Sequence, residues 1–266
     1  MVLSEPKIKL VNINKTFKTR RKTIVALKDI NIEVADKEFV AIVGPSGCGK
    51  STIIRLIDDI IKPTSGEIYI DGEKYGKVIP QSTIQKMGFI FQSPNLLPWL
   101  TVRENVEFTL RILKIDNQSY KENVDKLLEM MNLKRFENSM PSELSQSMLQ
   151  RIGVIRAMVY NPEILLMDEP YGQLDETMRE QLNLELLDIW SKLGQSIIFI
   201  THNVSEAVLL ADRVYVMSTN PGQIIEEIKI DIPRPRTLDI MQSEQFVNYE
   251  EKIVKLIGKV DLSKIK

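Results

Sequence analysis

The sequence has few cysteines and no long apolar run, and each shortage excludes a class of protein. Cys48 is the only cysteine among 266 residues, so no disulfide can form within the chain. This suits a reducing compartment, although many secreted proteins also lack disulfides. No uninterrupted apolar run approaches the ~20 residues that span a bilayer, and the first ten residues lack the apolar core of a signal peptide. We therefore expect a cytosolic protein that reaches a membrane only by docking on another protein.

Neither sign of charge is in excess. The formal net charge is −1, with 43% hydrophobic and 27% charged residues, which is typical of a globular protein. A balanced charge offers no electrostatic argument for binding nucleic acid or an anionic membrane. One short segment is basic, and a solvated hairpin loop explains it more simply than a nucleic-acid patch. Its cations are Lys15, Lys18, Arg20, Arg21 and Lys22. We expect no nucleic-acid partner.

Alternating patterns of strand and helix run along the chain. Short β-branched or continuous apolar runs predict strands at residues 8–13, 23–27, 30–34, 39–44, 66–72, 163–169, 196–202, 213–218 and 224–232. Helical periodicity follows Gly49 as far as the stop at Pro63, and it returns from about 101 to 160 with breaks near Asn117 and Pro141. A helix is also expected from about Ser243 to the end.

Strands that alternate with helices indicate an α/β core with a mainly parallel sheet. We expect an N-terminal antiparallel β subdomain before that core and a helical subdomain inserted at about 101–160. The Pro-rich stretch at 232–236, "IPRPR", is the best candidate for a boundary. It predicts a main domain over residues 1–240 and a helical tail over 241–266.

The strongest motif is "FVAIVGPSGCGKST" at residues 39–52. Its G-x-x-x-x-G-K-S pattern lies between a predicted buried strand and a helix, which is the context of a P-loop NTPase. Glycines allow backbone N–H groups to point at phosphate oxygens, and the helix dipole favours the anion. Lys50 would bind the β- and γ-phosphates, while Ser51 would offer its hydroxyl to Mg²⁺. The predicted ATP-binding residues are Gly44, Pro45, Ser46, Gly47, Cys48, Gly49, Lys50, Ser51 and Thr52.

Two questions stay open at this loop. Cys48 lies beside a helix N-terminus, which lowers the pKa of a thiol, so it could be reactive; its side chain could equally be incidental while its backbone faces phosphate. A P-loop alone also leaves kinases, GTPases, helicases and transport ATPases possible. The chain has no N-K-x-D motif of the kind that reads guanine in GTPases.

Two further apolar strands end in residues that could act on a bound nucleotide. "EILLMDEP" delivers Asp168, a candidate Mg²⁺ ligand, and Glu169, which could orient and deprotonate the attacking water. "SIIFITH" ends in His202, the only histidine of the chain. Because ligands collect at the carboxyl ends of strands in an open α/β sheet, we expect His202 to contact the γ-phosphate.

The stretch "SELSQSMLQRIGVIRAM", residues 142–158, looks like the start of a helix. Ser145 is a good N-cap for a helix that begins near Gln146. Ser147 and Gln150 also have capping-box spacing, so the helix could begin two residues later. We favour the cap at Ser145.

At this point the chain resembles the nucleotide-binding subunits of ATP-binding-cassette transporters over nearly its full length. Six motifs occur in the family's order: the phosphate loop at 44–52, "IFQ" with Gln92, "ELSQSM" with Ser145, Gln146 and Ser147, "LLMDEP" with Asp168 and Glu169, "YGQLD" with Asp175, and "ITH" with His202. Phe17 stands where the family usually has an aromatic residue that stacks on adenine.

The resemblance implies an enzyme that hydrolyses ATP with Mg²⁺. Glu169, His202 and Gln92 would be catalytic, and Gln92 would reach Mg²⁺ together with Ser51 and Asp168. Two copies would sandwich two ATP molecules head to tail, so that Ser145 to Ser147 of one copy face the phosphate loop of the other. The homodimer would bind integral permease subunits at the cytoplasmic face of the membrane, with an extracytoplasmic solute-binding protein as an indirect partner.

Residues 91–106, 168–179 and 230–236 are similar to the importer subfamily for nitrate, sulfonates, taurine and related solutes, and the Leu-Pro-Trp segment at 97–99 is the most suggestive piece. Two alternatives remain: a soluble single-cassette ATPase of the cluster-assembly type, and a module that binds ATP with little turnover. "ELSQSM" occupies the place of the family's signature motif, usually L-S-G-G-Q or L-S-G-G-M. The chain departs from the family there, because Gln146 and Ser147 replace the two glycines. We expect a working but slowed ATPase with weaker ATP-dependent dimerisation.

Overall fold

The computed structural model describes residues 5–19, 22–75, 79–115 and 118–262. The chain forms two compact units, one of Met1–Pro80 with Ser196–Lys266 and one of Gln81–Gln195. We call them the first and second unit and describe each by itself. The predicted division at residue 240 and the predicted insert at about 101–160 stay predictions.

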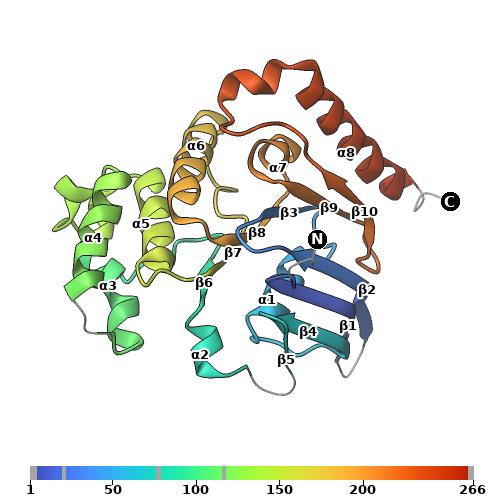
Figure 1. Ribbon diagram of the computed structural model, residues 1–266, viewed down its shortest axis with the longest axis horizontal. Coiled ribbons are helices and arrows are strands. Elements are labelled where there is room, and N and C mark those ends of the chain that lie inside the picture. The colour runs from blue at the N-terminus through green and yellow to red at the C-terminus, as the bar shows by residue number, and fades with distance from the viewer. Residues whose placement is uncertain (1–4, 20–21, 76–78, 116–117, 263–266) are drawn as a thin grey trace. The chain divides into compact units, whose positions relative to one another are not determined.

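The first unit contains an antiparallel sheet in the order β2-β1-β4-β5, shown in blue and cyan in Figure 1. Its strands are β1 (Ile8–Lys18), β2 (Thr23–Val34), β4 (Ser65–Ile70) and β5 (Glu73–Tyr75). The sequence predicted two strands with a turn where β2 is continuous. Asp29 has φ +50° there, and its backbone N–H donates to Asn14 Oδ1 at 3.1 Å. Side chains thus replace ladder bonds at a bulge, and no turn forms.

The same unit holds a second group of strands in the order β10-β9-β3-β8. These are β3 (Phe39–Val43), β8 (Ser196–Thr201), β9 (Arg213–Met217) and β10 (Ile224–Lys229). β3 pairs in parallel with both β8 and β9, and every residue of β3 and β8 is buried. The predicted α/β class, with a parallel core and an N-terminal antiparallel sheet, is confirmed.

Three helices complete the first unit: α1 (Lys50–Ile57), α7 (Val204–Leu210) and α8 (Glu244–Leu262), with a short 3₁₀ turn at Leu238–Gln242. The sequence predicted that α1 would continue towards Pro63, but it ends at Ile57 because Asp59 adopts a left-handed conformation with φ +58°. α8, in red in Figure 1, packs on α7.

The two arginines of the "IPRPR" segment attach it to this unit by hydrogen bonds. Arg234 donates to Asp212 Oδ1 at 3.0 Å and to the carbonyl of Leu210 at 2.6 Å. The buried Arg236 donates to the carbonyls of Val208 and Ala211, at the C-terminal end of α7. Burial, and then the charge of Arg234, lowers the pKa of Arg236 to about 10. Its hydrogen bonds satisfy carbonyls that the end of a helix leaves without partners.

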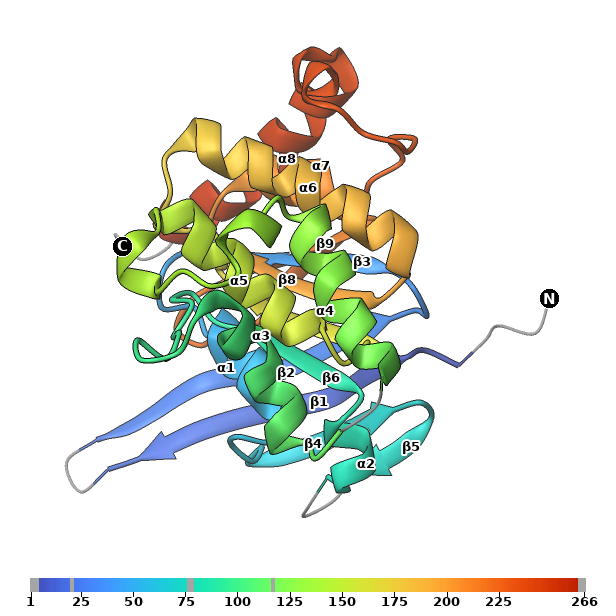
Figure 2. The ribbon, with the colours of Figure 1, turned by 90° about the vertical axis from the view of Figure 1, so that its left-hand side faces the viewer.

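The second unit has a short parallel pair, β6 (Met87–Ile90) with β7 (Ile164–Asp168). The sequence prediction missed β6, which has only four residues. The helices are α2 (Gln81–Ile84), α3 (Val102–Ile112), α4 (Gln118–Met130), α5 (Gln146–Met158) and α6 (Glu176–Leu193), with 3₁₀ turns at Lys134–Phe136 and Pro141–Glu143. α3, α4 and α5 pack side by side, as Figure 2 shows. Within the described residues, no helix is long and apolar enough to cross a membrane.

Candidate functional site

The phosphate loop leaves β3 at Val43 and enters α1 at Lys50. Gly49 precedes the helix with φ +105°, and no side chain caps the helix at that position. A Cβ on Gly49 would lie 2.6 Å from Leu27 Cδ2, so both the backbone conformation and the space require glycine. The first turn of α1 thus presents its backbone and its positive dipole end, which is the arrangement that binds phosphate.

Lys50 folds back over the loop that precedes it. Its ammonium donates to the carbonyl of Gly44 at 2.8 Å and to that of Pro45 at 3.3 Å. The residue is only 5% exposed, which is unusual for lysine. A positive charge is therefore held against the carbonyl groups at the start of the loop.

Cys48 and Gly222 pack closely at the loop, and the sequence analysis did not find the role of Gly222. Cys48 is 1% exposed, and a Cβ on Gly44 would lie 3.1 Å from its sulfur. A buried thiol in packing contact supports the incidental interpretation of Cys48. Gly222 donates its N–H to the carbonyl of Ala26 at 3.0 Å, and a Cβ there would lie 2.0 Å from the carbonyl oxygen of Cys48. Only glycine allows this approach, and the Pro-Gly dipeptide at 221–222 is the signal that could have marked it.

His202 follows the strand next to the phosphate-loop strand. Val43 pairs with Thr201 in the parallel ladder, so both segments leave the sheet at the same edge. His202 is exposed, and a buried network holds the chain on either side of it. Asn203 caps α7 by accepting the N–H of Glu206 at 3.1 Å, and its own N–H donates to Thr201 Oγ1 at 3.0 Å. The Thr201 hydroxyl in turn donates to the buried Glu206 carboxylate.

Phe17 lies near the end of β1, opposite Ile24 of β2, and is 38% exposed. The same hairpin touches the phosphate loop, because Leu27 packs against Gly49 and Ala26 binds Gly222. Ile24 and Leu27 are three positions apart on β2, which corresponds to a rise of about 10 Å along the strand. The hairpin thus places an exposed aromatic ring at a fixed distance from the phosphate loop.

In the second unit, a matching pair of strand ends brings three predicted residues together. Ile90 pairs with Met167, so Gln92 follows one strand and Asp168 and Glu169 end the other. Gly172 lies between them: a Cβ there would be 3.7 Å from both Gln92 Nε2 and Glu169 Cβ. Glu169 has φ +47°, which is uncommon for a residue with a side chain and is typical of strained functional positions.

The signature segment begins α5 as predicted. Ser145 is the N-cap, and its Oγ accepts the N–H of Met148 at 3.4 Å. Ser147 lies inside the helix with its Oγ 3.1 Å from Ser145 Oγ, and Gln146 is exposed. Gln150, at 1% exposure, donates to the carbonyl of Gln92 at 3.1 Å, so it forms no capping box with Ser147. The helix start at Ser147, the alternative from the sequence, does not occur.

Asp175 also begins a helix. It is the N-cap of α6, and its Oδ1 accepts the N–H of Met178 at 3.0 Å. One carboxylate oxygen is therefore engaged in holding the helix. The backbone of the segment 171–175 is turned back by hydrogen bonds from Gly172 N to Glu169 O and from Leu174 N to Tyr171 O.

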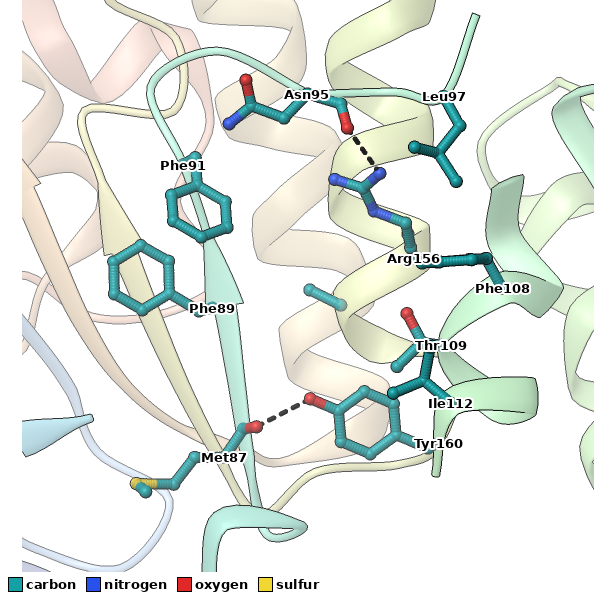
Figure 3. A pocket seen from close by; sticks show the side chains of 11 residues that line it. Met87, Phe89, Phe91, Asn95, Leu97, Phe108, Thr109, Ile112, Arg156 and Tyr160 are labelled. Carbon is teal, nitrogen blue, oxygen red and sulfur yellow. Dashed lines mark hydrogen bonds between the residues drawn. The ribbon is translucent and has the colours of Figure 1, made fainter. Parts of the chain in front are cut away.

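A pocket of about 340 Å³ lies in the second unit between α3, α5 and the segment that follows β6 (Figure 3). The rings of Phe89 and Phe91 stack 4.4 Å apart at one side of it. Arg156 donates to the carbonyls of Pro94 and Asn95, and Tyr160 donates to the carbonyl of Met87. α5, which begins at the signature, thus forms a wall of this pocket, whose lining combines apolar and polar side chains.

Known proteins resemble this chain over most of its length. A family model described as "ABC transporter" matches residues 27–172. The chain belongs to the ABC transporter family.

Relatives in this family include a nitrate import ATP-binding protein of Synechocystis sp., 39% identical over 94% of each chain. An aliphatic sulfonates import ATP-binding protein of Bacillus cereus is 37% identical over 93% of this chain and 94% of its own. A solved ATP-binding cassette, a dimer in a post-hydrolysis state with ADP and phosphate, has a TM-score of 0.73 and 34% identity. It covers 85% of this chain and is itself fully covered. The P-loop NTPase fold is thereby confirmed, and this ABC protein is an ATP-binding ATPase.

The predicted site residues of this ABC protein fall into two sets. The first unit carries Phe17, the phosphate loop and His202; the second carries Gln92, the signature, Asp168, Glu169 and Asp175. The phosphate loop and His202 follow the paired strands β3 and β8, and Gln92, Asp168 and Glu169 lie at the ends of the pair β6 and β7. Phe17 lies instead on the antiparallel strand β1, and the signature and Asp175 begin helices. The individual roles of these residues stay predictions.

The predicted Mg²⁺ ligands fit that ion by their chemistry. Ser51 offers a hydroxyl, Gln92 an amide oxygen and Asp168 a carboxylate, and all three are the hard oxygen donors that Mg²⁺ prefers. Mg²⁺ bound with a nucleotide takes few protein ligands because phosphates and water supply the others. Such an ion would neutralise charge on the phosphates.

Proposed function

We propose that this chain is the ATP-hydrolysing subunit of an importer and that it energises uptake of a small solute through a separate membrane permease. The observation that carries the proposal is the placement of two sets of reactive residues at the ends of paired strands, one set in each unit. The relatives that import nitrate or aliphatic sulfonates favour an oxyanion of this kind as the solute.

In the first unit, the chain would bind the nucleotide along its length. Phe17 would stack on adenine, and the backbone N–H groups at the start of α1 would bind phosphate oxygens. Lys50 would neutralise the β- and γ-phosphates, and its bonds to Gly44 and Pro45 hold it at the loop. His202 would contact the γ-phosphate from the neighbouring strand.

In the second unit, Glu169 would orient and deprotonate the attacking water, and Asp168 with Gln92 would hold Mg²⁺. Ser145 would donate to the γ-phosphate bound by a second copy of the chain, at the positive end of α5. Asp175 would lie at the same interface between the two copies of the chain. These roles require a homodimer with two ATP molecules between the copies.

The pocket along α5 would receive the permease. Its paired phenylalanines offer an apolar surface, and Ile112, which also lines the pocket, is 64% exposed. Trp99, two residues after the lining residue Leu97, is 69% exposed. Exposed aromatic residues of this size are characteristic of protein interfaces. Gln150 and Arg156 of α5 also donate hydrogen bonds to the segment from Gln92 to Asn95. Binding of the permease at this pocket would therefore affect the position of Gln92.

Steady-state hydrolysis of ATP by the purified chain tests the enzymatic part. Glu169→Gln keeps the shape of the side chain and removes the base, so we expect the rate to fall at least ~100-fold while ATP still binds. Glu163→Gln, an exposed residue near the start of the same strand, is the control and should keep the wild-type rate. An unchanged rate in Glu169→Gln would contradict the catalytic assignment, and chelation of Mg²⁺ should abolish hydrolysis in every variant.

Affinity purification from cells tests the transport part. The chain should co-purify with a polytopic membrane protein, and reconstitution of the two with a solute-binding protein should give ATP-dependent uptake of nitrate or a sulfonate. A stable complex with soluble proteins alone would instead favour the cluster-assembly type of ATPase. Retention of ATP with negligible hydrolysis would favour a binding module.

A further inference from the structure

Phe17 has two faces, and a cation already lies over one of them. The ammonium of Lys15 is 4.9 Å from the centroid of the Phe17 ring, which is within the range of a cation–π contact. Phe17 itself remains 38% exposed. The contact therefore covers part of the ring and leaves a surface for a second planar group.

Lys15 is fixed in place by a segment that follows α1. Its ammonium donates to the carbonyl of Lys62 at 2.6 Å. The chain beyond Lys62 runs along β1, where Thr64 N donates to Asn14 O at 2.8 Å and Thr16 N donates to Thr64 Oγ1 at 2.9 Å. Among the residues that the structure describes, no carboxylate pairs with Lys15, so its charge is directed at a neutral carbonyl and at the ring.

We propose that Lys15 is a positioning residue for the nucleotide base: its ammonium holds the Phe17 ring so that the opposite face is ready to stack on adenine. This inference rests on the proposed role of Phe17. A half-exposed ring that is free to rotate loses side-chain entropy when a ligand binds, and a ring that is already held loses less. The gain applies to the base and leaves the phosphates unaffected.

Calorimetric titration with ADP, which avoids hydrolysis, measures the effect. Lys15→Met should weaken ADP binding roughly two- to five-fold, the range of an exposed cation–π contact. The KM for ATP should rise by the same factor while kcat follows the wild type. Lys15→Arg, which retains a cation, should restore affinity. Lys18→Met, an exposed lysine on the same strand, is the control for lost charge and should bind ADP normally.

Lys15→Gln separates the cation from the anchor, since its amide can still donate to the carbonyl of Lys62. We expect it to bind ADP as weakly as Lys15→Met. Lys15→Gln also replaces Lys15→Met as the test variant if a thermal melt shows that Lys15→Met does not fold. Wild-type affinity in Lys15→Gln would show that the hydrogen bond matters and the charge does not, and would overturn the proposal.

Inorganic tripolyphosphate and a double-mutant cycle identify the group on which Lys15 acts. Tripolyphosphate affinity should be unchanged in Lys15→Met; an equal loss would mean that Lys15 attracts phosphates directly, contrary to the proposal. In a Phe17→Leu background, the Lys15 substitution should have no further effect. If it weakens ADP binding by its full factor there, Lys15 does not act through the ring. If Phe17→Leu alone leaves ADP affinity unchanged, the proposed adenine contact itself is wrong.

Discussion

Helices α1 and α5 both begin at a predicted phosphate contact, but their first turns are built in opposite ways. α1 follows a left-handed glycine, Gly49, and no side chain caps it. α5 follows Ser145, whose hydroxyl oxygen accepts a backbone N–H from the first turn. Thr101, Asp175 and Asn203 cap α3, α6 and α7 in the same manner. Among these five helices, α1 alone begins without a side-chain cap.

The difference indicates that the two halves of an ATP site would bind phosphate in different ways. The phosphate loop has its charge in place, since Lys50 already lies over the loop. The signature has its serine engaged twice, with the N–H of Met148 and with Ser147 Oγ. Its hydroxyl proton can reach a phosphate only if Ser147 is the donor of that hydroxyl pair. Substitutions at the two helix starts should therefore differ in size and in kind.

The largest effect is expected at Gly49. Gly49→Ala places a methyl group against Leu27 in a conformation that L residues avoid, so the free loop should relax away from this conformation. Regaining it on binding would cost ~3 kcal/mol, which corresponds to roughly 100-fold weaker nucleotide binding. Gly47→Ala is the matched control, because a Cβ there meets no atom within 4 Å. Calorimetry with ADP compares them. Equal losses in the two variants would mean that the tight packing against Leu27 is unimportant.

The other end of α1 gives a pH-dependent effect. Burial, and then the charge of Asp59, raises the pKa of Asp58 from 3.8 to about 6. The folded state therefore binds the proton more tightly, and its stability falls as the pH rises from about 4 to 6. Asp58→Asn should increase the free energy of unfolding by about 3 kcal/mol at pH 8 and by little at pH 4.

Urea denaturation at both pH values measures this difference. The exposed Asp36→Asn is the control and should show no such dependence. A stabilisation of Asp58→Asn that is the same at pH 4 and pH 8 would rule out titration of Asp58 as its cause.

At the capped helix, Ser145→Ala removes a cap and a predicted phosphate donor together. The free energy of unfolding should fall by about 1 kcal/mol, and the ATPase rate should fall as well. Thr101→Ala removes a comparable cap from α3 and should cost similar stability without loss of rate. Denaturation with steady-state kinetics checks both. If the two variants lose rate equally, the effect of Ser145 is only structural.

The smallest effect is expected from restoring the glycines. Gln146→Gly with Ser147→Gly should raise the ATPase rate and strengthen ATP-dependent dimerisation roughly two- to five-fold, at a cost of under ~1 kcal/mol in stability at the helix start. Steady-state kinetics of the double variant would measure the rate. Sedimentation with ATP, in a Glu169→Gln background that keeps ATP intact, would measure dimerisation. Unchanged rate and dimerisation would show that the bulk of Gln146 does not hinder the second copy.

Much of the fold could be predicted because its signals are local. The apolar runs that form β3, β7 and β8 indicate buried strands whatever surrounds them. The prediction failed where side chains far apart in sequence decide the backbone. The sequence predicted that the strand would break near Asp29, but Asn14 accepts the N–H of Asp29 and a bulge forms there. The short strand β6 forms because it pairs with β7.

The sequence by itself determined the order and chemistry of the motifs, because a phosphate loop needs only consecutive residues of the right type. It also limited the start of α5 to two positions, Ser145 and Ser147, since an N-cap acts within one turn. Tertiary structure alone decided which distant residues support these segments: Gly222 packs against Cys48, Gln150 donates to the carbonyl of Gln92, Arg236 donates to carbonyls at the end of α7, and the carbonyl of Lys62 holds Lys15. These contacts join segments distant in sequence, and no local pattern specifies which distant groups will meet.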